Sequence, residues 1–211
     1  MPATRFILVR HGETEWNLQE REMGQLDSPL TPLGLEQARR LGARLAQIKI
    51  DRLYSSDLPR AARTAAIIAE QTGHAVVFDV RLRERNMGIF QGLTAPEMDA
   101  RYPKEREAYR TVGFEYVIPN GKSARQRVDR TVACLDELAK NHPEQTLLVI
   151  THGGILMGFF EYALGLQFRS GRKLRRPNAA INVFSRDQRG WVLETWGDVT
   201  HLLGLATEAV E

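Results

Sequence analysis

Residues 6–17 read FILVRHGETEWN, and this stretch places reactive side chains directly after an apolar run. The run from Phe6 to Val9 is typical of a strand that is buried on both faces of a parallel sheet. Arg10 and His11 follow it immediately. Ligands of open α/β sheets collect outside the carboxyl ends of the strands, so we expect this arginine and histidine to enter a ligand site.

The rest of the chain repeats this pattern of short apolar runs separated by longer amphipathic segments. The further runs are DRLYS, AVVFDV and TLLVIT. This βαβ pattern predicts a three-layer α/β/α sandwich with a mostly parallel sheet. Near the end of the chain, AINVFS and WVLETW flank RDQRG, which predicts a hairpin and thus an antiparallel edge strand.

Between residues 88 and 122 the pattern becomes irregular, because Pro96, Pro103 and Pro119 interrupt it. We interpret this segment as a short helical lid insertion and residues 1–211 as a single domain. Helix starts elsewhere are indicated by capping residues. The expected N-terminal caps are Thr31 before Pro32, Asp57 before Pro59, Thr94 with Glu97 in a capping box, and Ser123.

Composition limits the class of protein. The single cysteine, Cys134, excludes an intramolecular disulfide and falls in an apolar helical stripe, which favours an inert core thiol in a reducing compartment. The N-terminal apolar run is too short for a signal peptide, and GGILMGFFEYALG is too short for a membrane span. We therefore expect a cytoplasmic protein without a membrane partner. The net charge of 29 − 26 = +3 suggests anionic partners.

Polar residues follow each predicted strand, and the parallel strands would bring them to one crevice. They are Arg10 and His11, then Ser56, Asp57 and Arg60, then Arg81, Arg83 and Glu84, and finally His152, Gly153 and Gly154. Two arginines beside a helix N-terminus can bind a doubly charged tetrahedral oxyanion. A neutral imidazole can attack phosphorus while a second donates to the phosphoryl oxygens. Glu84 then remains as the proton donor to the leaving oxygen.

Five blocks of sequence in this order resemble the histidine phosphatase superfamily, the cofactor-dependent phosphoglycerate mutase-like proteins. The blocks are RHGETEWN, DSPLTPLGLEQA, YSSDLPRAARTA, LRERNMGIFQG and ITHGG, and the resemblance runs from Arg5 to about Leu203. It implies that His11 is the phosphorylated nucleophile and Glu84 the proton donor. The other residues implied for the site are Arg10, Arg60 and His152 in the phosphate pocket, Asn17 as a phosphate contact, Gly153 through its backbone amide, and Gly24 as a substrate contact. The resemblance implies no metal and no other cofactor.

The resemblance favours the phosphatase branch. Mutases of this family carry a longer segment between the acid and the second-histidine helix, and its basic residues grip the glycerate carboxylate, whereas that segment is short here. An acidic residue is frequent before this helix, but PNGKS supplies Lys122. We therefore expect a metal-independent phosphomonoesterase that hydrolyses a small phosphorylated metabolite through phosphohistidine. The alternatives are a phosphoglycerate mutase and a non-catalytic phospho-ligand or protein-binding module.

Other motifs support simpler interpretations. NGKS resembles the end of a P-loop, but the required first glycine is replaced by Tyr116. No two histidines pair at helical spacing as metal ligands would, and we interpret His74, His142 and His201 as structural. The basic stretch FRSGRKLRRPN is typical of a solvated loop or of a surface that attracts anions, and it lacks the interleaved aromatics of a nucleic-acid site. Its cations are Arg169, Arg172, Lys173, Arg175 and Arg176. We expect no nucleic-acid partner, and no pattern indicates an oligomeric state.

Overall fold

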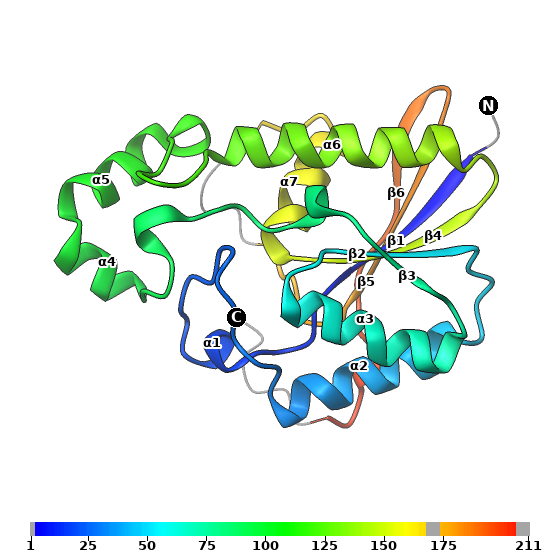
Figure 1. Ribbon diagram of the computed structural model, residues 1–211. Coiled ribbons are helices and arrows are strands. Elements are labelled where there is room, and N and C mark those ends of the chain that lie inside the picture. The colour runs from blue at the N-terminus through cyan, green and yellow to red at the C-terminus, as the bar shows by residue number, and fades with distance from the viewer. Residues whose placement is uncertain (1–2, 168–173, 206–211) are drawn as a thin grey trace.

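The computed structural model describes residues 3–167 and 174–205, which form an α/β fold (Figure 1). Within these residues six strands make one sheet in the order β3-β2-β4-β1-β5-β6. The strands are β1 (Thr4–Arg10), β2 (Arg52–Ser55), β3 (Val76–Phe78), β4 (Thr146–Thr151), β5 (Ile181–Asp187) and β6 (Gly190–Asp198). The α-helices are α1 (Glu15–Leu18), α2 (Pro32–Leu45), α3 (Pro59–Thr72), α4 (Ala95–Arg101), α5 (Pro103–Val112), α6 (Ala124–Asn141) and α7 (Gly153–Ala163).

The sheet is mostly parallel, as predicted. Strands β3, β2, β4 and β1 pair in parallel, whereas β5 is antiparallel to β1 and to β6. The predicted hairpin thus forms one edge of the sheet, with the reversed strand β5 second from that edge. Strands β1 and β4 pair in register from Arg5 opposite Thr146 to Arg10 opposite Thr151. Their carboxyl ends therefore coincide, which places His11 beside His152.

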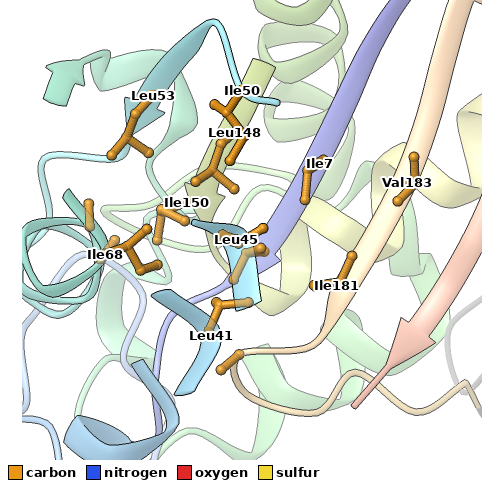
Figure 2. Packing of buried hydrophobic residues seen from close by; sticks show 14 of the residues in the cluster. Ile7, Leu41, Leu45, Ile50, Leu53, Ile68, Leu148, Ile150, Ile181 and Val183 are labelled. Atoms are coloured by element: carbon orange, nitrogen blue, oxygen red, sulfur yellow. The ribbon is translucent and has the colours of Figure 1, made fainter. Parts of the chain in front are cut away.

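Helices cover both faces of the sheet and make the three-layer sandwich that the sequence predicts. Ile7 and Val9 of β1 belong to a buried cluster with Leu41 and Leu45 of α2 (Figure 2). Successive strand residues point to opposite faces, and Phe6 accordingly packs in a second cluster with residues of α6 and α7. The continuous apolar run of β1 is explained by this double burial.

Capping chemistry sets three of the four predicted helix starts. Thr31, Thr94 and Ser123 each accept a hydrogen bond from a backbone amide in the first turn of α2, α4 and α6. The prediction for Asp57 is wrong, because Leu58 holds the N-cap position of α3 and Asp57 pairs with the guanidinium of Arg83. A carboxylate from a distant loop contributes instead: Asp27 Oδ1 accepts from the Arg60 amide at 3.2 Å.

The segment between β3 and α6 contains short helices. It includes η1 (Val80–Leu82), η2 (Gly88–Phe90), α4, α5 and η3 (Gly113–Glu115), and it has a cluster of its own around Phe90, Met98 and Ile118. Figure 1 shows α4 and α5 beyond the N-terminal end of α6, to one side of the sheet. Residues 88–122, which we expected to form a lid insertion, fall within this longer segment. A last 3₁₀ helix, η4 (Thr200–Leu202), follows β6.

The residues that we interpreted as structural lie in the body of the protein. Cys134 is buried and belongs to the cluster beneath α6 and α7. His142 ends α6 and bonds the Tyr54 hydroxyl at 2.8 Å, His74 bonds the Ile50 carbonyl, and His201 bonds the Ala179 carbonyl. No helix within residues 3–167 or 174–205 combines the length and the apolar character that a membrane crossing requires.

Candidate active site

A cavity of about 370 Å³ lies where β1 and β4 end. It brings together all eight residues that the sequence predicts for the site. These are Arg10, His11, Asn17, Gly24, Arg60, Glu84, His152 and Gly153. They come from the loops after β1 and β4, from the start of α3 and from the segment after β3, so the convergence of parallel strand ends produces the site.

His11 is held in one orientation at the base of this cavity. Its amide donates to the Thr151 carbonyl at 3.0 Å, and its own carbonyl accepts from Asn178. Nδ1 lies 2.8 Å from the Gly12 carbonyl, an oxygen that can only accept, so Nδ1 carries the proton of the neutral ring. The lone pair is therefore on Nε2. Burial, and then the charges of Arg60 and Arg10, lower the pKa of His11 well below its ordinary value.

His152 lies beside His11, with ring centroids 5.3 Å apart. Its Nε2 lies 2.8 Å from the Ser56 hydroxyl, while its buried Nδ1 has no hydrogen-bond partner within the described residues. When the Ser56 hydroxyl donates to Nε2, Nδ1 carries the proton and can donate to a ligand. Burial, followed by the charges of Arg60 and Arg10, lowers the pKa of His152 well below its usual value.

Two arginines, the buried Arg60 and the half-buried Arg10, line the cavity together with the histidines. Arg60 donates to the carbonyls of Leu26 at 2.8 Å and Gly24 at 2.7 Å, and Arg10 donates to the Arg176 carbonyl at 2.7 Å. The Nε atoms of both arginines are buried and have no hydrogen-bond partner in the described part of the chain. Burial, then the nearby charge of Arg176, lowers the pKa of Arg10 to about 10. Both guanidinium groups remain charged near neutral pH and can clamp an anion.

Glu84 enters the cavity as an anion. Its Oε1 accepts from the Arg85 amide at 2.7 Å and its Oε2 accepts from the Gly154 amide at 2.8 Å. Burial by itself would raise the pKa of Glu84, but the charge of Arg127 and the two amides outweigh it, and the pKa is lowered. The Gly154 amide is thus engaged by a protein carboxylate, which leaves Gly153 as the first amide of α7 to face a ligand.

The remaining predicted residues line the cavity in different ways. Asn17 Oδ1 accepts from the Thr14 amide at 3.1 Å in a capping box, so its amide nitrogen is the end suited to contact an anion. Gly24 has a φ of +54° and its carbonyl holds Arg60 in place. A Cβ on Gly153 would lie 3.3 Å from Arg10 Nε, so the missing side chain lets that guanidinium approach α7.

Two arginines that the sequence places in the crevice do not line the cavity. Arg83 pairs with Asp57, and Arg81 pairs with Asp79 and Glu137. The expectation for both was wrong because strand β3 ends early, at Phe78, and the chain turns through η1 before it reaches the cavity. Asp79 caps that turn by accepting from the Arg81 amide at 2.8 Å, and it too stays outside the cavity.

Sequence reasoning missed several residues of the cavity wall. They include Trp16, Arg21, Glu22, Arg85, Tyr109, Arg127 and Arg176. Arg176 belongs to the basic stretch for which we expected either a solvated loop or a surface that attracts anions, and its place in the cavity wall fits the second. Arg169, Arg172 and Lys173 of that stretch lie outside the described residues. For Arg127 the sequence did carry a signal, because it is in helical register with the buried Thr131 and Leu138 of α6. No group of three or more potential metal ligands occurs in the described portion of the chain.

The two neutral histidines predict a loss of stability on acidification. In the folded protein their pKa values are lowered, so the unfolded chain binds more protons once the pH falls below about 6.5. Each histidine should cost about 1.4 kcal/mol of unfolding free energy at a pH one unit below that value. Urea unfolding at pH 7.5 and 5.5 measures this loss. His152→Gln should lose less on acidification than the wild type, and an equal loss in both would contradict the assignment.

The chain is similar to known proteins along almost its whole length. Residues 6–199 match the family model of the histidine phosphatase superfamily (branch 1). Phosphoglycerate mutase-like protein 4 of Arabidopsis thaliana is 37% identical over 201 residues, which are 93% of this chain and 86% of that protein. The probable phosphoglycerate mutase GpmB of Escherichia coli O1:K1 / APEC is 36% identical over 200 residues, which are 92% of this chain and 93% of that protein.

Solved structures share the same fold. YhfR of Bacillus stearothermophilus has a TM-score of 0.87 at 27% identity and covers 94% of this chain and 99% of its own. A mycobacterial glucosyl-3-phosphoglycerate phosphatase in complex with VO3 has a TM-score of 0.81 at 31% identity and covers 92% of this chain and 98% of its own. The α/β fold class predicted from the sequence is thereby confirmed.

Proposed function

Because the chain belongs to the histidine phosphatase superfamily (branch 1), we propose that it hydrolyses a small phosphorylated metabolite through a phosphohistidine on His11. The orientation of His11 carries this proposal: the Gly12 carbonyl engages Nδ1, and Nε2 keeps its lone pair in a cavity that Arg10 and Arg60 also line. A neutral imidazole fixed in this tautomer is a competent nucleophile toward phosphorus. We propose neither a nucleic-acid partner nor a membrane partner for this protein.

The first half of the reaction uses the anion clamp. Arg10 and Arg60 hold the phosphoryl group through their free Nε donors, and His152 donates from Nδ1 as charge develops on the phosphoryl oxygens. The lone pair of His11 Nε2 forms the new bond to phosphorus, and the bond from phosphorus to the leaving oxygen breaks. That oxygen takes a proton from the carboxyl group of Glu84, which returns to the carboxylate form.

The second half returns the enzyme to its starting state. The Glu84 carboxylate accepts a proton from a water molecule, whose oxygen attacks the phosphoryl group on His11. The bond from phosphorus to Nε2 breaks, the electron pair returns to the ring, and the phosphate takes the proton from Glu84 as it leaves, so that Glu84 is a carboxylate again. If an alcohol of a glycerate acceptor attacked in place of water, the same site would act as a mutase.

The mutase is the second candidate because two relatives carry that name in whole or in part. We prefer the phosphatase because the segment before α6 is short and because a similar structure is named a phosphatase. Incubation of the pure protein with a panel of phosphate esters, with and without glycerate, tests the choice. We expect inorganic phosphate to be released. Transfer of the phosphoryl group to glycerate would establish the mutase. If no ester were turned over, the remaining interpretation would be a phospho-ligand-binding module without catalytic activity.

Metal removal should leave the activity unchanged, because every charge in this mechanism is met by a side chain or a backbone amide. We expect equal rates before and after treatment with EDTA. Vanadate should inhibit, because it adopts a five-coordinate geometry like that of the phosphoryl group in transfer, and VO3 occupies a similar protein in the mycobacterial complex. Activity lost to EDTA and restored by a divalent cation would contradict the metal-free mechanism.

A further inference from the structure

Arg127 is a largely buried cation in the cavity that the mechanism above does not use. It lies in the first turn of α6 and its side chain is 13% exposed. Its Nη1 lies 3.7 Å from Oε1 of Glu84. Its Nε is buried without a hydrogen-bond partner within residues 3–167 and 174–205. A buried guanidinium needs a compensating charge, and Glu84 is the acid with which it forms an ion pair.

The neighbouring helix α7 leaves room for this arginine. A Cβ on Gly154 would lie 2.7 Å from Arg127 Nη1, and a Cβ on Gly158 would lie 3.0 Å from Nη2. The same Cβ on Gly154 would lie 2.5 Å from Glu84 Oε1. The two glycines are one helical turn apart on the same face, so they form a slot in which the guanidinium and the carboxylate meet.

Glu84 is arranged to be an anion before a ligand binds. Both carboxylate oxygens accept backbone amide hydrogens, from Arg85 and from Gly154, and a proton on either oxygen would weaken this arrangement. Other charged groups that face Glu84 are mostly cations. They are Arg60 from α3, Arg10 from β1, Arg127 and Arg130 from α6, and the acid Glu22 from the loop after α1. Arg127 makes the largest of the charge contributions that lower the pKa of Glu84.

We propose that Arg127 is a positioning residue that keeps Glu84 in its carboxylate form in the free enzyme, so that the proton for the leaving oxygen arrives on the phosphate of the substrate. This inference rests on the proposed phosphatase function. Arg127 itself touches neither His11 nor the phosphoryl clamp in this assignment; it acts through Glu84. The productive encounter is then between the enzyme with ionised Glu84 and the substrate monoanion.

The proton balance of this step is complete. The monoanion of the ester carries one proton on a non-bridging oxygen, and this proton moves to the Glu84 carboxylate in the complex. Glu84 then gives it to the bridging oxygen while the bond from phosphorus to that oxygen breaks and the bond to His11 Nε2 forms. The products are the free alcohol, phosphohistidine with its Nδ1 proton retained, and the Glu84 carboxylate. No further acid or cofactor takes part.

The direct test is a titration of Glu84 by NMR in protein labelled with carbon-13 at the glutamate side-chain carboxyl. Glu84→Gln identifies the signal by its disappearance. We expect Arg127→Met to raise the titration midpoint of Glu84 by about 1 to 2 pH units, since an opposite charge at this distance favours the ionised form. Arg127→Lys should shift it less. Arg125→Met is the matched control on the exposed side of α6, where Arg125 pairs with Glu115, and it should leave the midpoint unchanged.

The kinetic test is the pH dependence of kcat/KM with phenyl phosphate, whose acidic limb reports an ionising group of the free enzyme. Arg127→Met should move this limb to higher pH and Arg127→Lys should restore most of the wild-type profile. An unchanged Glu84 midpoint in folded Arg127→Met overturns the inference. If that variant does not fold, the same measurement on the neutral Arg127→Gln decides. Absence of ester turnover by the wild type would instead refute the proposed function, while the titration would still report on the Arg127–Glu84 pair.

Discussion

His11→Ala should abolish both turnover and covalent labelling. Brief incubation of the wild type with a phosphorus-32 ester should leave one phosphoryl group on His11, and a bond from phosphorus to nitrogen makes this label acid-labile and stable to alkali. Alanine has no lone pair to offer at the position of Nε2. The expected loss of kcat is on the order of 10⁶-fold, as for removal of other enzyme nucleophiles. Labelling quenched in alkali and single-turnover kinetics measure both effects.

A matched histidine separates this result from a general loss of structure. His142→Ala removes an imidazole that bonds the Tyr54 hydroxyl at the end of α6, outside the cavity, and should retain label and turnover. His152→Ala should weaken but not abolish labelling, because the lone pair on His11 Nε2 survives. A label on a serine, or turnover by His11→Ala at the wild-type rate, would show that another group is the nucleophile.

The predicted site depended on elements that the sequence defines locally. Arg10, His11 and His152 follow the two central strands, and strands β1 and β4 are buried on both faces, so their apolar runs end where the strands end. Parallel pairing in register then brings the strand ends together without further information. Arg60 could be placed because it lies at the start of α3, directly after β2.

Edge positions were less predictable. AVVFDV has the composition of a buried strand, but β3 lies at the edge of the sheet and Phe78 is 55% exposed, so its apolar residues did not mark how far the strand extends. The early end of β3 turned Arg81 and Arg83 outward to Asp79 and Asp57. The prediction of Asp57 as the N-cap of α3 was wrong for a related reason, since Asp57 has Arg83 as a partner from a distant segment. Such pairings depend on tertiary structure, which local patterns do not encode.

The protonation state of Glu84 also could not be predicted without the structure. From the sequence we expect a carboxyl group that donates a proton, and a donor near neutral pH needs a raised pKa. The structure shows the opposite in the free protein, because Arg127 and the amides of Arg85 and Gly154 together outweigh burial. The two statements agree if the phosphate that enters the cavity brings both negative charge and a proton. Arg127 is separated from Glu84 by 43 residues in the sequence, and the two side chains meet beside Gly154 of α7.

Glu84→Gln should slow an alkyl phosphate far more than p-nitrophenyl phosphate in the step that phosphorylates His11. An alkoxide is strongly basic and leaves only with a proton, and a positioned general acid typically contributes about 100- to 10,000-fold. p-Nitrophenolate leaves without this help. The amide side chain of glutamine has nearly the shape of the carboxyl group but cannot transfer the proton. Single-turnover rates of ester cleavage are the measurement, since the hydrolysis of phosphohistidine also uses Glu84 and would mask the difference in the steady state.

The control for this prediction is the same chemical change at the neighbouring acid. Asp79 lies five residues before Glu84, caps η1 and pairs with Arg81 outside the cavity. Asp79→Asn should therefore cleave both esters at nearly the wild-type rates. Binding of vanadate to Glu84→Gln should persist, because Arg10, Arg60 and His152 form the clamp independently of the acid. Equal losses for the two esters in Glu84→Gln would mean that Glu84 shapes the cavity without supplying the proton, and selective loss of alkyl phosphate cleavage in Asp79→Asn would transfer the role of acid to Asp79.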